Sequence, residues 1–201
     1  KMTDGEIDIL VATQAAAKGH NFPRLTLVGV VDADLGLAGG DLRAGERTFQ
    51  LLHQVVGRAG REEGRGYGFL QTHQPEHPVM RALIAQDRDA FYAAEIEVRE
   101  KTGYPPFGRL ASLLVSGADK HETEAFARRI AAVSPIHDDV RVLGPAEAPL
   151  AVVRGRHRFR ILVKSPRNFD LSAYLRQWMA DAPKAKGTLK LEVDVDPQSF
   201  F

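Results

Sequence analysis

Two arginines with a glycine between them are the residues of this chain best suited to bind a polyanion. Arg58 and Arg61 stand three positions apart, with Gly57 before the first and Gly60 between the two. Residues three apart lie on one face of a helix, and glycine lets a ligand approach the backbone closely. Two guanidinium groups on one face fit a multiply charged anion such as the γ-phosphate of a nucleotide. A solvated basic helix end is the alternative interpretation.

A loop between two predicted strands offers a second set of phosphate-binding groups. The aliphatic runs Ile9–Thr13 and Leu25–Asp32 are typical of buried parallel strands, and ligands bind at the carboxyl ends of such strands. Thr13 supplies a hydroxyl group, Lys18 a charge and Gly19 an accessible backbone amide for phosphate oxygens. An ordinary connection without a ligand is the alternative.

A basic run near the carboxyl end forms a third candidate site. It holds Arg154, Arg156, Arg158 and Arg160 and contains no acidic residue. In a strand that follows a turn, the last three of these arginines share one face, with Phe159 on the other. Such a row repels itself unless an anion binds, so it suits the phosphates of DNA or an acidic peptide. A solvated sheet edge protected by charge is the alternative.

The histidine and aspartate residues lead us to predict no bound metal. The sequence from His73 to His77 matches the H-x-x-E-H zinc motif. That motif requires both histidines on one helical face, and Pro75 within it makes a turn more favourable. Asp32 and Asp34 follow a predicted strand, and we expect them to have a structural or interface role because the chain has no phosphate-binding loop.

Three residues near the carboxyl end have simple structural interpretations. Asp194 and Asp196 are expected to be solvated residues at the end of a strand. Trp178 shares helical spacing with Leu171 and Leu175, so we expect it in the core. An exposed edge of this tryptophan that stacks on a base is the alternative.

The composition excludes several classes of protein. The 27 Lys and Arg residues nearly balance 26 Asp and Glu residues, so the overall charge does not indicate a polyanion partner. The absence of cysteine excludes a disulfide framework and fits a cytoplasmic protein. No apolar run has membrane-spanning length, and no signal peptide opens the chain. The chain begins almost directly on a predicted strand, so we expect a piece cut from a longer protein.

Residues 1–74 alternate predicted strands and helices around the arginine pair. The segment Arg43–Val56 carries apolar residues at helical spacing, and Tyr67–Gln71 has the composition of a further strand. Together with the two strands described above, this alternation is typical of a doubly wound α/β layer with a parallel sheet.

Residues 75–106 form a predicted helical connector, and residues 107–201 form a predicted α+β domain. The order of elements in that domain is βαββαβ, the split arrangement of ferredoxin-like domains. This order predicts a fold and says nothing about chemistry. The connector helices are predicted at Val79–Ala85 and Asp87–Lys101, the domain helices at Glu122–Val133 and Leu171–Met179, and the domain strands at Leu110–Ser116, Val140–Leu143 with Ala151–Val153, Phe159–Lys164 and Leu189–Val195.

Taken together, these segments resemble the PriA family of replication-restart DNA helicases. Gln54–Arg61 resembles motif VI of superfamily 2 helicases, and Ala12–Pro23 resembles motif V. The resemblance covers nearly the whole chain and implies a partial RecA-like helicase lobe followed by a small α+β domain. Further matching segments are Val31–Asp34, Asp41–Arg47, Gln71–Pro78, Tyr104–Phe107, Leu143–Pro145 and Asp194–Pro197.

The resemblance also implies a nucleotide site at the arginine pair. Arg58 and Arg61 would act as arginine fingers that reach the γ-phosphate of ATP, with Gln54 beside them. Gly19 and its neighbours would contact the nucleotide or the backbone. Asn21 departs from the superfamily pattern, because an acidic residue that contacts the ribose is frequent there. An amide can still bond a hydroxyl group, so we expect an altered or weaker contact.

The partners implied by the resemblance are nucleic acid and proteins of replication restart. Thr13 and Lys18 would face the track of single-stranded DNA. The arginines of the basic run would bind branched DNA or the acidic tail of single-stranded DNA-binding protein. Other primosome proteins are further implied partners, and no membrane is expected.

The family resemblance also indicates what a full-length relative would add. The chain contains no G-x-x-x-x-G-K-[ST] loop, so most of the ATP and magnesium site would lie in an upstream lobe, and a zinc region would lie upstream as well. We expect the full-length protein to be an ATP-dependent 3′-to-5′ DNA helicase, and this part alone to be inactive. The alternatives are a docking module of an ATPase-inactive homologue and an RNA helicase. The open edge of a partial sheet predicts self-association.

Overall fold

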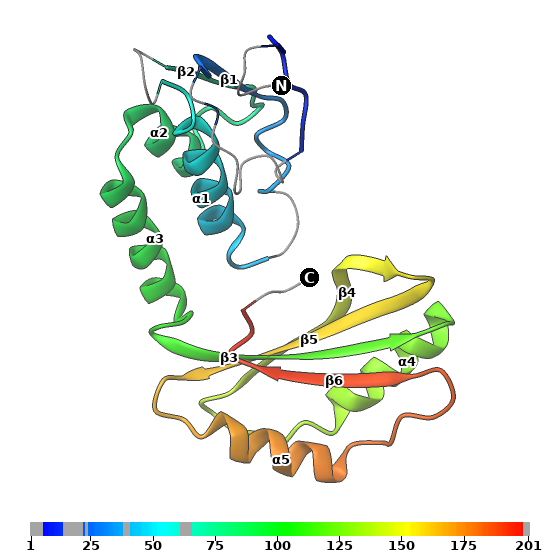
Figure 1. Cartoon of the computed structure of the whole chain (residues 1–201). Coiled ribbons are helices and arrows are strands. Elements are labelled where there is room, and N and C mark those ends of the chain that lie inside the picture. Colours follow the sequence, from blue (N-terminus) through cyan, green and yellow to red (C-terminus); the bar gives the residue numbers. More distant parts are fainter. Residues whose placement is uncertain (1–5, 14–21, 23, 38–40, 61–65, 199–201) are drawn as a thin grey trace. The chain divides into compact units, whose positions relative to one another are not determined.

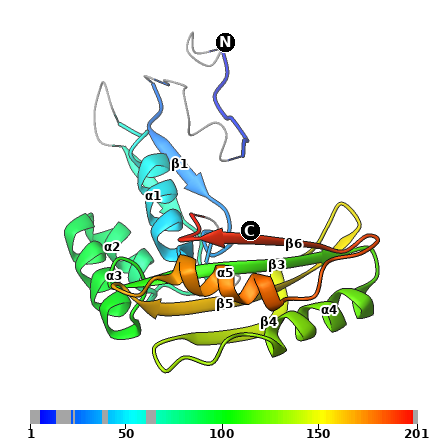
Figure 2. The same cartoon turned by 90° about the horizontal axis from the view of Figure 1, so that it is seen from below.

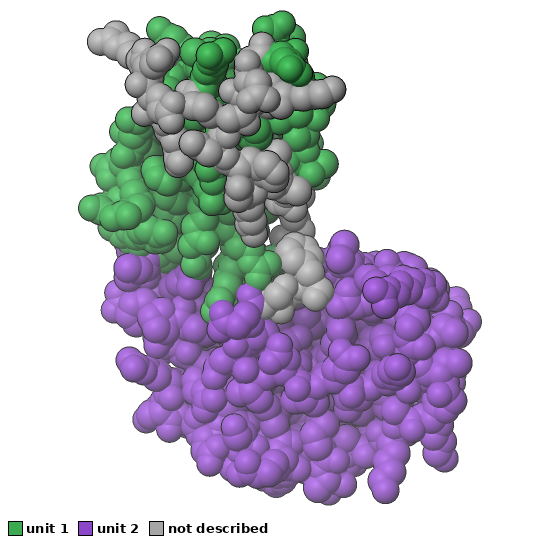
Figure 3. Space-filling model, viewed as in Figure 1, with its two compact units in different colours: residues 1–95 green, residues 96–201 purple. Residues whose placement is uncertain are grey.

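The computed structural model describes residues 6–13, 22, 24–37, 41–60 and 66–198. Within it the chain divides into two units, residues 1–95 and 96–201 (Figure 1, Figure 3). The division falls inside one helix, between Glu95 and Ile96. The domain limits predicted at residues 74 and 106 stay predictions, because a division by contacts does not show which segments fold independently.

The first unit is built on two short parallel strands, β1 (Leu27–Val30) and β2 (Tyr67–Leu70). The helix α1 (Ala44–Val56) connects them, and α2 (Pro78–Ala85) and α3 (Arg88–Thr102) follow. The predicted helix before the arginine pair, the predicted strand after it and both connector helices are therefore confirmed. Stacking of two phenylalanine rings on neighbouring helices, with centroids 4.2 Å apart, joins α1 to the start of α3. The buried residues of the two small cores are Phe49, Val79, Ala82 and Phe91, and Ala33, Leu52 and Met80.

The strand predicted for Ile9–Thr13 is wrong, because the structure has no strand in residues 6–13. Ile9 and Val11 are 80% and 92% exposed. An apolar run becomes a stable strand only when a neighbouring strand takes up its backbone hydrogen bonds. Among the described residues, β1 and β2 pair only with each other.

The segment that carries the two histidines is a turn, as predicted. Nδ1 of His77 accepts a hydrogen bond from the Val79 amide at 3.2 Å, and Pro78 occupies the first turn of α2. His73 and His77 therefore precede the helix and do not share a helical face. The described residues contain no group of three side chains that could hold a metal ion. Their helices also include none with the length and apolar character needed to cross a membrane.

The second unit has the predicted βαββαβ order. Its strands form one antiparallel sheet in the order β4-β5-β3-β6, and both helices cover the same face of that sheet (Figure 1, Figure 2). The other face is covered by neither of these two helices (Figure 1, Figure 2). The elements are β3 (Gly108–Gly117), α4 (Lys120–Ala132), β4 (Arg141–Val153), β5 (Arg156–Pro166), α5 (Leu171–Asp181) and β6 (Lys190–Val195).

The core of the second unit lies between this sheet and its two helices. Trp178 is fully buried, and its indole nitrogen donates to the carbonyl oxygen of Ile130 at 2.9 Å. The core role predicted for this tryptophan is confirmed, and stacking on a base is excluded by its burial. The other buried members of the cluster are Ala111, Leu113, Val115, Phe126, Ala127, Ile130, Phe159, Ile161, Val163, Leu171, Tyr174, Leu175 and Leu189.

The strand predicted in two pieces is the single, irregular strand β4. Its register against β5 shifts twice, between Leu143 and Ala146 and between Glu147 and Val152. Gly144 lies in the first shift with φ at 98°, and a Cβ atom there would stand 2.8 Å from a carbonyl oxygen of β5. Glycine permits both this backbone conformation and this close approach.

Candidate functional site

The first arginine of the pair lies in a turn and not on a helix. The helix α1 ends at Val56, and the turn that follows spans residues 57–60. The backbone amide of Arg58 donates to Val55 at 3.1 Å, and its side chain is half-buried. The helical placement assumed for the pair is therefore wrong for Arg58, because the chain has already left the helix. Arg61 lies outside the described residues.

The position of this turn is fixed by the strands beside it. The amide of Gly60 donates to the carbonyl oxygen of Leu25 at 2.9 Å, and the amide of Tyr67 donates to Thr26 at 2.9 Å. Gly60 has a φ of 73°, in the left-handed region that favours glycine. The arginine turn (residues 57–60) is thus held against the chain that enters β1, at the amino-terminal edge of the two parallel strands.

Two further residues predicted for the nucleotide and DNA sites are described, and both are exposed. Gln54 lies in the last turn of α1, one helical turn before Arg58. Thr13 lies in the segment without regular structure at the start of the chain. The other three predicted residues, Lys18, Gly19 and Asn21, lie outside the described residues. Gln54 thus lies one helical turn before the arginine turn. The structure does not test the other predicted positions.

Asp34 joins the segments that follow the two strands, at their opposite, carboxyl-terminal edge. Its carboxylate accepts hydrogen bonds from the Thr72 hydroxyl group and from the His73 amide, both at 2.6 Å. The hydrogen bond from Thr72 is the main reason that the pKa of Asp34 is lowered, and the bond from His73 adds to it. These contacts give Asp34 a structural role, which is one of the two predicted for it; the structure does not test the interface role.

The basic run lies at a hairpin, as its sequence predicted. Arg154 and Gly155 form the two-residue turn between β4 and β5, with φ angles of 50° and 74°. Along β5, Phe159 is buried among the core residues beneath the sheet. Arg158 and Arg160 occupy the alternate positions, so they belong to the face opposite α4 and α5. The alternation predicted for this strand is confirmed.

Arg156 is engaged within the fold. Its guanidinium group donates to the carbonyl oxygen of Ser116 at 3.0 Å, to the Ser116 hydroxyl oxygen at 3.2 Å and to the carbonyl oxygen of Thr188 at 2.5 Å. These bonds join β5 to the end of β3 and to the segment before β6. Arg158 donates more weakly to the carbonyl oxygen of Leu150, at 3.4 Å. Arg156 and Arg158 therefore differ in local role, although they share one face.

Acidic residues stand on the same face of the sheet, two strands away. Arg160 is paired with Leu114 of β3, and Leu114 is paired with Glu192 of β6. By the same pairing, Asp194 also belongs to this face. Strands in a sheet lie about 4.8 Å apart, which puts β6 about 10 Å from β5. The expected self-repulsion of an isolated basic row is therefore reduced by these acidic neighbours.

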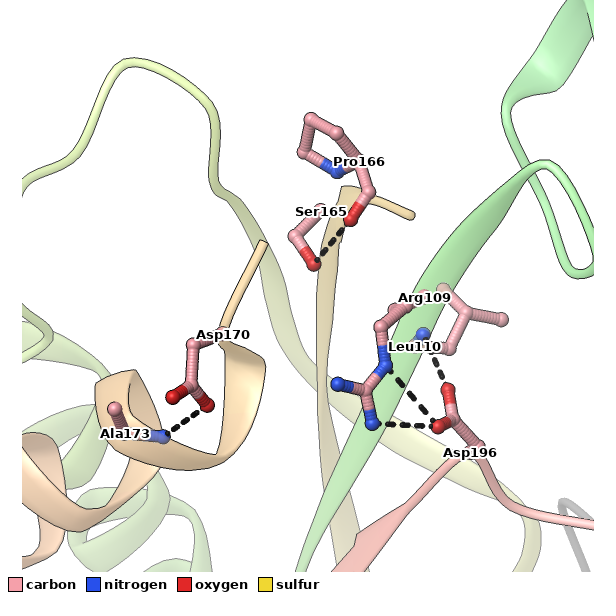
Figure 4. Close-up of polar contacts among 7 residues, drawn as sticks. All are labelled: Arg109, Leu110, Ser165, Pro166, Asp170, Ala173 and Asp196. Atoms are coloured by element: carbon pink, nitrogen blue, oxygen red, sulfur yellow. Dashed lines mark hydrogen bonds and ion pairs between the residues drawn. The ribbon is translucent and has the colours of Figure 1, made fainter. Parts of the chain in front are cut away.

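Asp196, expected to be solvated, is a partner in an ion pair. Its carboxylate accepts from the Arg109 guanidinium group at 2.8 Å and from the Leu110 amide at 3.3 Å (Figure 4). The amide of Asp196 in turn donates to the carbonyl oxygen of Leu110 at 2.7 Å. Asp196 is exposed just beyond the end of β6, as expected. The ion pair was not predicted, because Arg109, 87 positions earlier, reaches this residue only through the pairing of β3 with β6.

Comparison with known proteins matches both units of this fold. The model for the primosomal protein N C-terminal domain matches residues 100–198, and the model for the helicase conserved C-terminal domain matches residues 1–63. The replication restart protein PriA of Rickettsia felis is 43% identical over 201 residues, which is 100% of this chain and 31% of that protein. The chain belongs to the PriA family.

More distant members of the PriA family match almost as much of the chain. The replication restart protein PriA of Synechocystis is 39% identical over 98% of this chain and 24% of its own length. That of Bacillus subtilis is 39% identical over 87% of this chain and 22% of its own length. The chain thus spans at most about a third of these relatives. The predicted family is confirmed, and the arginine turn lies within the part matched by the helicase model.

Proposed function

We propose that this chain is the carboxy-terminal part of an ATP-dependent 3′-to-5′ DNA helicase, located in the cytoplasm, that restarts stalled replication forks. Its relatives are named replication restart protein PriA. The observation that carries the proposal is the arginine turn, whose backbone is held against the chain that enters β1 by the bond from Gly60 to Leu25. A preorganised guanidinium group is what an arginine finger requires.

In this proposal Arg58 and Arg61 stabilise the charge on the γ-phosphate while ATP is cleaved. ATP and magnesium supply the transferred phosphoryl group and its charge neutralisation, and another lobe of the full-length protein holds them. The contribution of this chain is to position the two guanidinium groups, with Gln54 next to them, and Gly19 and Asn21 at the nucleotide. Without a phosphate-binding loop, the chain alone does not hydrolyse ATP.

A chimera tests the proposal for Arg58. This chain replaces the matching 201 residues of the Rickettsia felis protein, and DNA-stimulated ATP hydrolysis is measured. Loss of an arginine finger lowers kcat by about 1000-fold or more, so we expect this loss in Arg58→Ala, with little change in KM for ATP. Arg88→Ala, an exposed arginine of the same unit, serves as the control. Unchanged kcat in Arg58→Ala would remove the proposal.

A docking module is the second candidate function, and the face of the second unit opposite α4 and α5 favours it. Arg158 and Arg160 stand on that face, and together with Arg154 and Arg156 they are proposed to bind branched DNA. The acidic tail of single-stranded DNA-binding protein is the alternative partner, and other primosome proteins are further candidates. Thr13 and Lys18 are proposed to contact single-stranded DNA in the helicase part.

Binding assays on the chain separate these partners. Fluorescence anisotropy compares forked DNA, forked RNA and an acidic peptide, at several salt concentrations. Each lost phosphate contact lowers the salt slope by about 0.7–0.9, so Arg158→Ala should weaken DNA binding and reduce the slope by about that amount. Arg128→Ala, on α4 with a surface partner in Glu124, should change neither. If Arg158→Ala weakened binding of the acidic peptide and left DNA binding unchanged, the partner would be a protein instead.

A further inference from the structure

Gly66, the residue before β2, packs against the peptide bond between Ala59 and Gly60. A Cβ atom built on Gly66 would stand 2.5 Å from the amide nitrogen of Gly60 and 2.6 Å from the carbonyl oxygen of Ala59, and closer still to the Ala59 carbonyl carbon. All three atoms belong to the backbone, so no rotation of a side chain relieves the clash. A side chain at position 66 therefore requires that Gly66 and the arginine turn move apart.

The peptide that Gly66 contacts is the link between the two arginines. It follows Arg58 directly and precedes Arg61, and its N–H group is the donor to Leu25 at 2.9 Å. The same peptide is thus held by a hydrogen bond and limited by the close approach of Gly66. Displacing it changes that bond and shifts the neighbouring residue, Arg58, at the same time.

Two other glycines of the same sheet lack this relation. A Cβ atom on Gly68 would meet Cγ1 of Val56 at 2.5 Å, which is a side-chain atom that can move. Gly29 lies on β1, paired with Phe69, and a Cβ atom there would meet nothing within 4 Å. Of these three glycines, only Gly66 would place a Cβ atom against the backbone of the arginine turn.

We propose that Gly66 is a positioning residue for the arginine turn: the missing side chain sets the distance between β2 and the Ala59–Gly60 peptide, and so the reach of Arg58. The inference rests on the proposed function, in which Arg58 contacts the γ-phosphate. A misplacement of about 1 Å at a reacting group costs about 100-fold in rate. A methyl group on residue 66 needs about 1 Å more space from these backbone atoms, so it displaces the turn by a distance of that order.

The first test measures DNA-stimulated ATP hydrolysis in the chimera with the Rickettsia felis protein. We expect Gly66→Ala to lower kcat by about 10- to 100-fold, with KM for ATP within about threefold, because positioning acts on the transition state. Gly29→Ala is the matched control and should stay within about twofold, since its methyl group enters open space. An unchanged kcat in Gly66→Ala, with Arg58→Ala inactive, would overturn the inference and leave the proposed function standing.

The second test needs no catalysis and uses the 201-residue chain. Hydrogen exchange is followed at the amide of Gly60, which bonds Leu25, and at the amide of Gln71, which donates to Val30 at 2.9 Å. We expect Gly66→Ala to speed exchange at Gly60 and to leave Gln71 protected. Fast exchange at both amides would show that Gly66 stabilises the whole sheet, and slow exchange at both would show that the turn has not moved. Either result rejects the positioning role, whatever the outcome for Arg58→Ala.

Discussion

The two units differ in how completely their sheets are covered. In the second unit, one face of a four-stranded sheet lies under two helices, and Phe159, Ile161 and Val163 of β5 are almost fully buried. In the first unit, Tyr67 and Phe69 of the two-stranded sheet remain 58% and 62% exposed. Apolar residues of the strands thus have different environments in the two units. The comparison shows that burial follows from the neighbours that a strand finds, and not from its residues alone.

Removing the central tryptophan of the second unit should have the largest effect. Trp178→Ala leaves a cavity in the core and removes the donor to Ile130, which costs about 3–5 kcal/mol of unfolding free energy. We expect the peptides of residues 96–201 to lose protection from hydrogen exchange together. The core of the second unit shares no residue with the two small cores of the first unit. Peptides of the first unit should therefore keep their protection from exchange.

Arg176→Ala provides the control on the same helix, because this side chain is exposed. Its effect should stay within about 0.5 kcal/mol. Simultaneous loss of protection in both units of Trp178→Ala would show that the chain unfolds as one cooperative body, and the comparison between two separate units would fail.

The same contrast explains which elements the sequence could predict. Each helix and strand of the second unit was predictable because its partners lie within the unit and its apolar residues repeat at the period of the element. The run Ile9–Thr13 has the same apolar character as a strand, but no described strand pairs with it. A local pattern predicts a capacity to pair, and pairing itself depends on a neighbour.

The candidate sites show a similar limit at the level of single side chains. The hairpin at Arg154 and Gly155 and the alternation after it were readable from the sequence. The partners of Arg156 and Asp196 were not, because they come from Ser116 and Arg109, far away in the chain. The shared helical face predicted for Arg58 is absent because α1 ends at Val56, and Gly57 and Gly60 in the motif are a signal for that end.

Arg156 and Arg158 offer the next test, within the second unit. Arg156→Ala removes bonds that join three segments, so it should lower the unfolding free energy by about 1–2 kcal/mol. Arg158→Ala removes one long bond and should stay within about 0.5 kcal/mol. Urea denaturation of both variants measures the difference. Equal stability would mean that the two arginines have the same role on this face.

The exposed face of the first unit gives a smaller effect on stability and a visible effect on association. We propose that the chain self-associates through Tyr67 and Phe69, because open strands with exposed apolar side chains pair readily. Phe69→Ser should lower the average mass seen by light scattering and leave the unfolding free energy within about 0.5 kcal/mol. Ile136→Ser, fully exposed in the second unit, is the matched control. A monomeric parent chain would contradict this prediction.

The smallest expected effect is an acid dependence at Asp34 of the first unit. Hydrogen bonds from Thr72 and His73 lower the pKa of Asp34 from its usual value of 3.8. The folded state therefore favours the ionised carboxylate, whose contribution to stability is fully present above about pH 4 and is lost as the pH falls through the lowered pKa. As the pH falls below about 4, hydrogen exchange at the His73 amide should become faster relative to its intrinsic rate. In Asp34→Asn this step should vanish, and its persistence in the variant would assign the acid response to another group.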